Sequence, residues 1–267
     1  NSIRYLSGKS PFNWLVALFP DKYLIEFMSY LVILKIGFSG FTFSWYLTRH
    51  FKTRSAAVVP FAVFYAMSGY LAAYNWNVMW LDCIFLFPLI ALGLEKLVTE
   101  GKYRLYCISL ALCILSNYYI SIMVCIFLVL YFLVLLVSHC SSLRRMGGAV
   151  LRFALFSVLA GGMAAILLIP EYSALHLTKF CDFNFPSKLT FYFSTIVMLA
   201  RHCMDVAVET GLDHWPNIYC GVAVFLLVPL YVSNAKISLR EKAARLGLLA
   251  FLLVSFSTNV LNFMWHG

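Results

Sequence analysis

The fold is decided by residues 105–138, LYCISLALCILSNYYISIMVCIFLVLYFLVLLVS, an apolar stretch that contains no charged side chain. A single helix of this length would measure about 50 Å, whereas the hydrocarbon core of a bilayer is about 30 Å thick. The polar run SNYY at residues 116–119 interrupts the stretch near its middle. The pattern therefore predicts two membrane helices, over residues 104–116 and 119–138, with a turn at Asn117.

The same apolar character extends over the whole chain. Of its 267 residues, 63% are hydrophobic and only 12% are charged, against about 45–50% and about 25% in soluble domains. Further apolar runs alternate with polar turns, which predicts an all-α, polytopic transmembrane bundle of about eight spans in a single domain, residues 1–267. The remaining spans are expected at residues 23–46, 56–74, 78–97, 150–169, 218–232 and 246–261. The sequence starts at Asn1 without a leader and stops after an apolar run, so we expect an internal piece of a longer protein.

The basic residues are concentrated in four short turns. Thirteen of the twenty Lys and Arg lie at residues 49–54, 96–104, 144–152 and 236–245, which share one side of the membrane if there are eight spans. Because Lys and Arg collect in cytoplasmic loops, these turns are predicted to be cytoplasmic. The net charge of +9 then reflects membrane topology, and nucleic acid is not expected as a partner. The long polar segment 171–216, which carries five acids, is predicted to lie outside.

Two of the charged residues within the predicted spans are candidates for a functional role. Asp82 lies about one turn into its span, and it is either an acid that faces an outer cavity or an acid stabilised by the helix dipole. Lys35 lies near the middle of the first span. Its long side chain either extends to the cytoplasmic interface or forms an internal pair with a buried carboxylate or a lipid phosphate.

Other polar residues have a functional and a structural interpretation. Asn117 and Tyr118 either line a pocket for a sugar or a lipid, or simply form the turn between two helices. Arg201 in the outer segment could bind a phosphate. His266 lies just beyond the last span. The sequence contains no GxGxxG, P-loop, HExxH or zinc-ligand pattern, so no metal site and no cofactor are predicted.

Seven of the eight cysteines fall into two groups by their surroundings. Four lie in apolar runs and are expected to pack as small side chains, namely Cys83, Cys107, Cys113 and Cys125. Cys181, Cys203 and Cys220 lie in or beside the outer segment, where a disulfide, with Cys181 and Cys203 as one pairing, is an open alternative.

Six short stretches, in this order and spacing, resemble the YfhO-like bacterial membrane proteins within the GT-C class of polytopic glycosyltransferases. The stretches are Ser10-Pro11-Phe12-Asn13 with Leu18-Phe19-Pro20, Leu34-Lys35-Ile36-Gly37, Trp80-Leu81-Asp82 with Phe87-Pro88-Leu89, Leu115-Ser116-Asn117-Tyr118-Tyr119, Asn217-Ile218-Tyr219-Cys220-Gly221, and Trp265-His266-Gly267. They extend over nearly the whole chain.

The resemblance implies an enzyme of the bacterial cytoplasmic membrane whose working side is outside. It would take a sugar from a polyprenyl-phosphate carrier and transfer it to an envelope glycopolymer such as teichoic acid. GT-C enzymes generally carry an essential acid in the first outer loop, which would precede Asn1 here. Asp82 is the matching outer acid within the sequence, and its catalytic role is an expectation by resemblance. The residues expected to bind substrate are Lys35, Asn117, Tyr118, Arg201 and His266.

The metal dependence and the function each have more than one interpretation. Divalent metal use varies in the GT-C class, and no residue here indicates a metal. One alternative function is a lipid or polysaccharide transporter, in which Lys35 and Asp82 would line the pathway. Another is a membrane subunit without catalytic activity. Membrane lipids are expected to surround the protein in each case.

Overall fold

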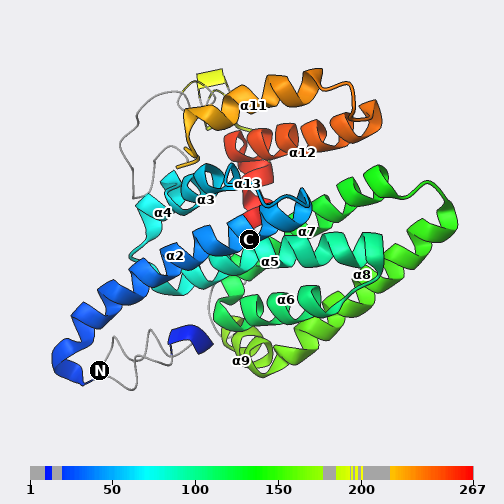
Figure 1. The fold of residues 1–267 in the computed structure, drawn as a ribbon. Helices are drawn as coiled ribbons and strands as arrows, with labels where there is room; N and C mark the ends of the chain where they lie inside the picture. Colours follow the sequence, from blue (N-terminus) through cyan, green and yellow to red (C-terminus); the bar gives the residue numbers. More distant parts are fainter. Residues whose placement is uncertain are drawn as a thin grey trace.

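The computed structural model describes residues 10–13, 20–176, 185–192, 194, 196–197, 200 and 217–266. These residues are almost entirely helical (Figure 1), and the only β pairing among them is a single bridge between Phe191 and Thr258. The predicted all-α fold is therefore confirmed. The helices are η2 (Asp21–Tyr23), α2 (Leu24–His50), α3 (Val58–Ala66), α4 (Gly69–Tyr74), α5 (Val78–Glu100), α6 (Arg104–Ser116), α7 (Tyr118–His139), α8 (Leu143–Met163), α9 (Ala165–His176), α11 (Val222–Ser233), α12 (Leu239–Ser257) and α13 (Asn259–His266).

Helix α5 is the centre of the bundle and packs against α2, α6, α7 and α8. Residues such as Leu81, Ile90 and Leu94 are completely buried, as expected of a helix that is apolar on all sides. Its approach to α6 is very close at Gly93. A Cβ atom at this position would lie 2.5 Å from the backbone nitrogen of Tyr106, so no other residue fits without displacing a helix.

Pro88 lies inside α5 and creates a local hydrogen-bonding deficit. Proline has no N–H group, so the carbonyl of Ile84, four residues earlier, loses its helical partner. Tyr65 of α3 donates its hydroxyl hydrogen to this carbonyl over 2.7 Å. Since an unsatisfied carbonyl is costly in lipid, this bond stabilises the position of α3 against α5.

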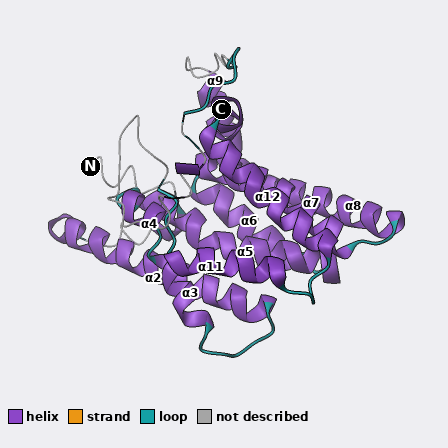
Figure 2. Ribbon diagram, turned by 90° about the horizontal axis from the view of Figure 1, so that it is seen from above, coloured by secondary structure: helices purple, strands orange, loops and turns teal. Residues whose placement is uncertain are grey.

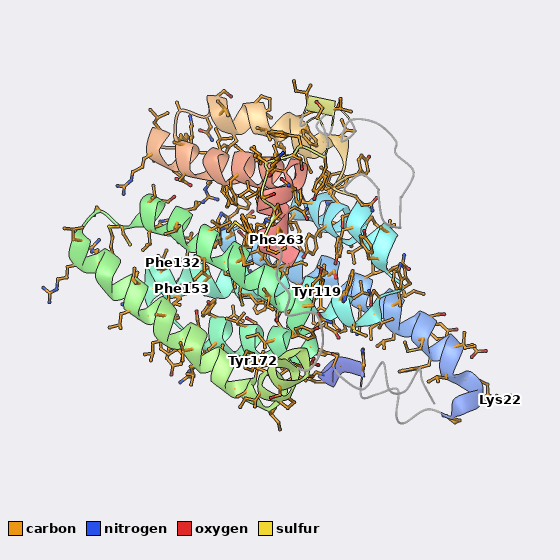
Figure 3. The ribbon with its side chains drawn as sticks, turned by 180° about the vertical axis from the view of Figure 1, so that it is seen from behind. Lys22, Tyr119, Phe132, Phe153, Tyr172 and Phe263 are labelled. Atoms are coloured by element: carbon orange, nitrogen blue, oxygen red, sulfur yellow. The ribbon has the colours of Figure 1, made fainter. Side chains whose placement is uncertain are left out.

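The predicted break in the 105–138 stretch is confirmed. Asn117 alone separates α6 from α7, and its extended backbone, with φ −161° and ψ 116°, ends one helix before the next begins. The side-chain oxygen of Asn117 accepts a hydrogen bond of 2.9 Å from the N–H of Ile120 and thereby caps α7. Further along α7, Phe132 stacks on Phe153 of α8 with ring centroids 4.2 Å apart (Figure 3).

The predicted count of about eight spans is not confirmed. Among the described residues, four helices are long and apolar enough to cross a membrane, namely α2, α5, α7 and α8. The stretch 56–74 is divided into α3 and α4, and the stretch 150–169 extends across the junction of α8 and α9. Helices α6 and α11 have 13 and 12 residues, whereas a full span needs about 20. Apolar composition reveals where lipid-compatible segments lie but not whether each is one continuous helix.

Helix α9 continues through Pro170 as far as His176, so the first six residues of the segment 171–216 are helical. A proline in the interior of a helix removes one backbone donor without always ending the helix. Much of the remaining segment lies outside the described residues.

The four basic turns meet at one end of the bundle, on the right of Figure 1. Residues of the turns 49–54 and 96–104 line one pocket, and residues of 96–104 and 144–152 line a second. Arg240, in the fourth turn, donates a hydrogen bond of 3.4 Å to the carbonyl of Cys140, beside the third. We call this the basic end, and we call the opposite end, where α5 begins, the Asp82 end.

Candidate functional site

A buried ion pair joins α2 to α5 at the Asp82 end. Nζ of Lys35 lies 2.7 Å from Oδ1 of Asp82, and the two side chains are 2% and 0% exposed. Of the alternatives for Lys35, pairing with a buried carboxylate is the one that the structure contains. Asp82 does not contact water in this arrangement, so its position differs from that of an acid open to an outer cavity.

The position of Lys35 in α2 explains this burial. The first turns of α2 project beyond the other helices (Figures 1 and 2), and Ile25 and Tyr30 there are exposed. From Leu31 onward one side of the helix is buried, through Lys35 and Ser39 at intervals of one turn. Lys35 is therefore central in its own helix, yet it lies level with the first turns of α5.

The other polar atoms of the pair also have partners. Besides Asp82, the ammonium of Lys35 donates to Oδ1 of Asn13 and, over 3.1 Å, to the carbonyl of Val78. These contacts match the three hydrogens of a lysine ammonium. The second carboxylate oxygen of Asp82 accepts a hydrogen bond of 2.5 Å from the hydroxyl of Ser10. Buried charges are tolerated when they are paired and hydrogen-bonded in this way.

The N-terminal segment 10–13 is thus attached to two helices by polar contacts. Its three residues after Ser10 form a single helical turn, and the ring of Phe12 packs edge-on against Phe85 of α5 with centroids 5.0 Å apart. Ser10 and Asn13 are almost completely buried. We call Ser10, Asn13, Lys35 and Asp82 the polar network.

Three of the stretches that carry the family resemblance meet in the polar network, namely 10–13, 34–37 and 80–82. Sequence reasoning identified Lys35 and Asp82 as site candidates but missed Ser10 and Asn13. The available signal was that each is a polar residue within a stretch that resembles the YfhO-like family. Nothing local to residues 10–13 indicates that a lysine and an aspartate are their partners.

A row of aromatic rings lies beside the first turn of α5. Tyr70 contacts Tyr74, Tyr74 contacts Trp80, and Trp80 contacts Tyr119 of α7, with centroids 5.1, 5.7 and 6.3 Å apart. Tyr119 is marked in Figure 3. Aromatic side chains with a polar tip are typical of membrane interfaces and of binding pockets. The row connects α4, α5 and α7. Its α5 member, Trp80, is two residues before Asp82 in the sequence.

The remaining predicted site residues are placed as follows. Asn117 caps α7, which is the structural role that its sequence position suggested, and Tyr118 is half-buried in the first turn of the same helix. His266 is the last residue of α13, but its side chain lies outside the described residues. Arg201 and the pair Cys181 and Cys203 also lie outside them. Their predicted roles stay predictions.

The described cysteines behave as packing residues. Cys83, Cys107 and Cys113 are buried, and all six described thiols are free, including that of Cys220. The thiol of Cys83 points to the carbonyl of Cys113, 3.6 Å away, next to the break at Asn117. Within the described part of the chain, no three side chains of His, Cys, Asp or Glu gather closely enough to hold a metal ion.

A second polar cluster, which sequence reasoning did not identify, lies at the basic end of α5. Oε1 of Glu95 accepts hydrogen bonds from the hydroxyls of Tyr46 and Tyr131, at 2.8 and 2.5 Å. Its other oxygen lies 2.8 Å from Nδ1 of His50. Glu95 thereby connects α2, α5 and α7, about 20 Å from Asp82 by helix rise. We interpret this cluster as a structural clamp on the three helices.

These features define a helical membrane protein in which a buried ion pair connects an N-terminal segment to the central helix. The chain belongs to the family described as Bacterial membrane protein YfhO, whose family model matches residues 4–267. No significant match was found among curated proteins or among solved structures.

Proposed function

We propose that the chain is the membrane part of a glycosyltransferase that takes a sugar from a polyprenyl-phosphate carrier. The acceptor would be an envelope glycopolymer such as teichoic acid, outside the bacterial cytoplasmic membrane. The observation that carries this proposal is that three stretches with the family resemblance, 10–13, 34–37 and 80–82, meet in the polar network. A fold needs no charged pair in its apolar body, so a carboxylate and an ammonium held there indicate a chemical purpose.

The polar network contains groups that suit this reaction. A carboxylate such as Asp82 can accept the proton of an acceptor hydroxyl as that oxygen attacks the sugar. An ammonium such as Lys35 can stabilise the negative charge that develops on the departing phosphate. The aromatic row beside α5 supports the proposal, because pockets for small molecules are lined mainly by apolar and aromatic side chains with a few polar groups.

Substrate access requires a change at residues 10–13. Ser10 and Asn13 occupy the positions next to Asp82 and Lys35 that a hydroxyl and a phosphate would need. We propose that this segment moves aside when substrate enters and that its two side chains hold the pair in a satisfied state when the site is empty. Lys35 then belongs to the substrate-binding residues as well as to the resting network.

The orientation of the protein supports the same location for the reaction. Lys and Arg of the four basic turns meet at one end, and such turns are cytoplasmic in most membrane proteins. The Asp82 end would then lie at the outer surface. A lipid-linked sugar and a polymer acceptor would meet there.

The test is a comparison of envelope polymers from cells with the intact gene, without it, and with the gene restored. Mass analysis is expected to show that a sugar substituent disappears with the gene and returns with it. Unchanged polymers in cells that demonstrably contain the protein would overturn the proposal. The purified full-length protein should also transfer sugar from a polyprenyl-phosphate donor to the acceptor in vesicles. Movement of the donor across the vesicle membrane without transfer would instead identify a transporter.

A further inference from the structure

We infer that the basic end carries a binding site for an anionic phospholipid of the cytoplasmic leaflet. The lipid's acyl chain would occupy an apolar cavity between α2, α3 and α11, and its phosphate would contact Arg49, Lys52 and Arg54. This site is separate from the polar network and does not depend on the proposed function.

The apolar half of the site is a cavity of about 690 Å³. It is lined almost wholly by apolar side chains, among them Phe43, Leu47, Phe61, Phe64, Val224 and Leu227. Cavities of roughly 300–1,000 Å³ are the usual size of ligand sites. Its lining offers scarcely any polar partner, so a water-filled cavity is unfavourable and a hydrocarbon chain suits it.

The basic half is a neighbouring pocket of about 550 Å³. Five cations line it, namely Arg49, Lys52, Arg54, Lys96 and Lys102. The single acid in its lining, Glu100, lies 2.7 Å from Lys102, so these two charges offset each other. The remaining cations favour an anion. Clusters of several Lys and Arg just beyond the cytoplasmic end of a membrane helix are typical of sites for anionic lipid headgroups.

The turn 51–57 forms the wall between the two pockets. Its alternate residues Phe51, Ser55 and Ala57 line the apolar cavity, whereas Lys52 and Arg54 line the basic pocket. Thr53 lines both pockets, so the two pockets adjoin at this residue.

Lys52 supports a binding role for this turn. It has a positive φ of 50° and is the only non-glycine residue in that conformation in the described chain. This backbone region is unfavourable for lysine and is often retained where a side chain must be directed to a site. The two adjoining pockets match the two halves of a phospholipid, which a free phosphate ion or a soluble acidic protein would not.

The experiment measures lipid binding by the purified full-length protein with native mass spectrometry. The probes are phosphatidylglycerol, phosphatidylcholine with the same acyl chains, and inorganic phosphate. We expect selective retention of phosphatidylglycerol. The variant with Arg49→Gln, Lys52→Gln and Arg54→Gln should bind phosphatidylglycerol roughly a hundredfold more weakly. Each basic residue near an anionic headgroup strengthens binding about fivefold, and three such factors multiply to about a hundred.

A matched variant carries Arg144→Gln, Arg145→Gln and Arg152→Gln, three cations at the same end that line a different pocket. It should retain phosphatidylglycerol binding to within about threefold if the effect is local to the first site. Equal losses in both triple variants would show general charge attraction and would overturn the proposal. Equal binding of phosphatidylcholine, or of inorganic phosphate alone, would also overturn it.

A second variant tests the cavity without changing any charge. Ala57→Phe places a ring in the apolar cavity and should weaken phosphatidylglycerol binding at least tenfold, because the acyl chain and the ring compete for one space. The thermal melting of this variant reports whether it is folded, and it keeps the proposal testable if the triple variant does not fold. Unchanged binding in a folded Ala57→Phe protein would exclude the cavity as the site of the acyl chain.

Discussion

Replacing Asp82 with asparagine while Lys35 stays in place is expected to destabilise the protein strongly. The ammonium would lose the carboxylate 2.7 Å away and would remain buried, with an exposed fraction of 2%. Its other acceptors, Asn13 and the carbonyl of Val78, are neutral and cannot balance its charge. Removing one partner of a buried pair costs about 3–5 kcal/mol, and we expect a loss in that range.

The double variant Lys35→Met with Asp82→Asn removes both charges and retains similar volumes. The amide oxygen of an asparagine can still accept the hydrogen bond from Ser10, and methionine fills the space of the lysine stem. Neutral replacements of a buried pair are often close to neutral in stability. We therefore expect the double variant to lie within about 1–2 kcal/mol of the parent, with a coupling energy of at least about 3 kcal/mol.

The assay is reversible unfolding of the purified full-length protein in mixed micelles, for the parent, both single variants and the double variant. The control cycle uses Lys102→Met and Glu100→Gln. This exposed pair has a similar separation of 2.7 Å, but its side chains are 75% and 46% exposed. The coupling energy of this exposed pair should be close to zero. If the stability losses of the two single variants, at Lys35 and at Asp82, simply add in the double variant, the reasoning is refuted.

The same double variant separates a structural role of the Lys35–Asp82 pair from a role in sugar transfer. If the pair takes part in transfer, envelope decoration should be abolished or strongly reduced even though the protein folds and accumulates. Normal decoration with full expression would show that Asp82 is not a key catalytic residue. The single variant alone could not make this distinction, because a poorly folded protein is inactive for any reason.

Three further variants test the packing around α5 in the same unfolding assay. Gly93→Ala should cost about 3 kcal/mol, because its methyl group would overlap backbone atoms of α6. Tyr65→Phe should cost about 1–2 kcal/mol, because the Ile84 carbonyl would lose its donor in an apolar setting. Glu95→Gln should cost about 2 kcal/mol, because the amide cannot accept all three polar contacts that the carboxylate accepts.

Each of these variants has a matched control. Gly147→Ala, with no atom near the added methyl group, should be neutral or stabilising by up to about 1 kcal/mol. Tyr231→Phe should be neutral or stabilising, because the buried hydroxyl of Tyr231 has no hydrogen-bond partner among the described residues. Glu100→Gln removes an exposed charge and should leave stability nearly unchanged. A control variant that loses as much stability as the variant it is matched to would contradict the corresponding explanation.

Features that depend on neighbouring residues could be predicted from the sequence. The break at Asn117 follows from a stretch too long for one span and from a polar run in its middle, and the structure has it at the predicted residue. The gathering of the basic turns at one end follows from the alternating direction of successive helices. Asp82 and Lys35 were identified because a charged residue within an apolar run always requires an explanation.

Features that depend on distant parts of the chain could not be predicted in this way. Nothing in residues 10–13 shows that Ser10 will bind Asp82 or that Asn13 will bind Lys35, since these contacts arise only when α2 and α5 pack. The count of about eight spans is not confirmed for a related reason. An apolar run such as 56–74 has the composition of one helix, and only the local backbone shows the interruption near Ser68.

The hydrogen bond from Tyr65 to the carbonyl of Ile84 bears on how the protein is built in the cell. Synthesis proceeds from the N-terminus, so α3 is complete before the proline-bearing α5 enters the bilayer. The donor is therefore already present when the carbonyl first meets lipid. A circular permutation that placed α3 after α5 could keep every contact of the finished fold, yet α5 would insert with that carbonyl unsatisfied. Such a permutant should show a lower yield of inserted protein while the molecules that do fold keep their stability.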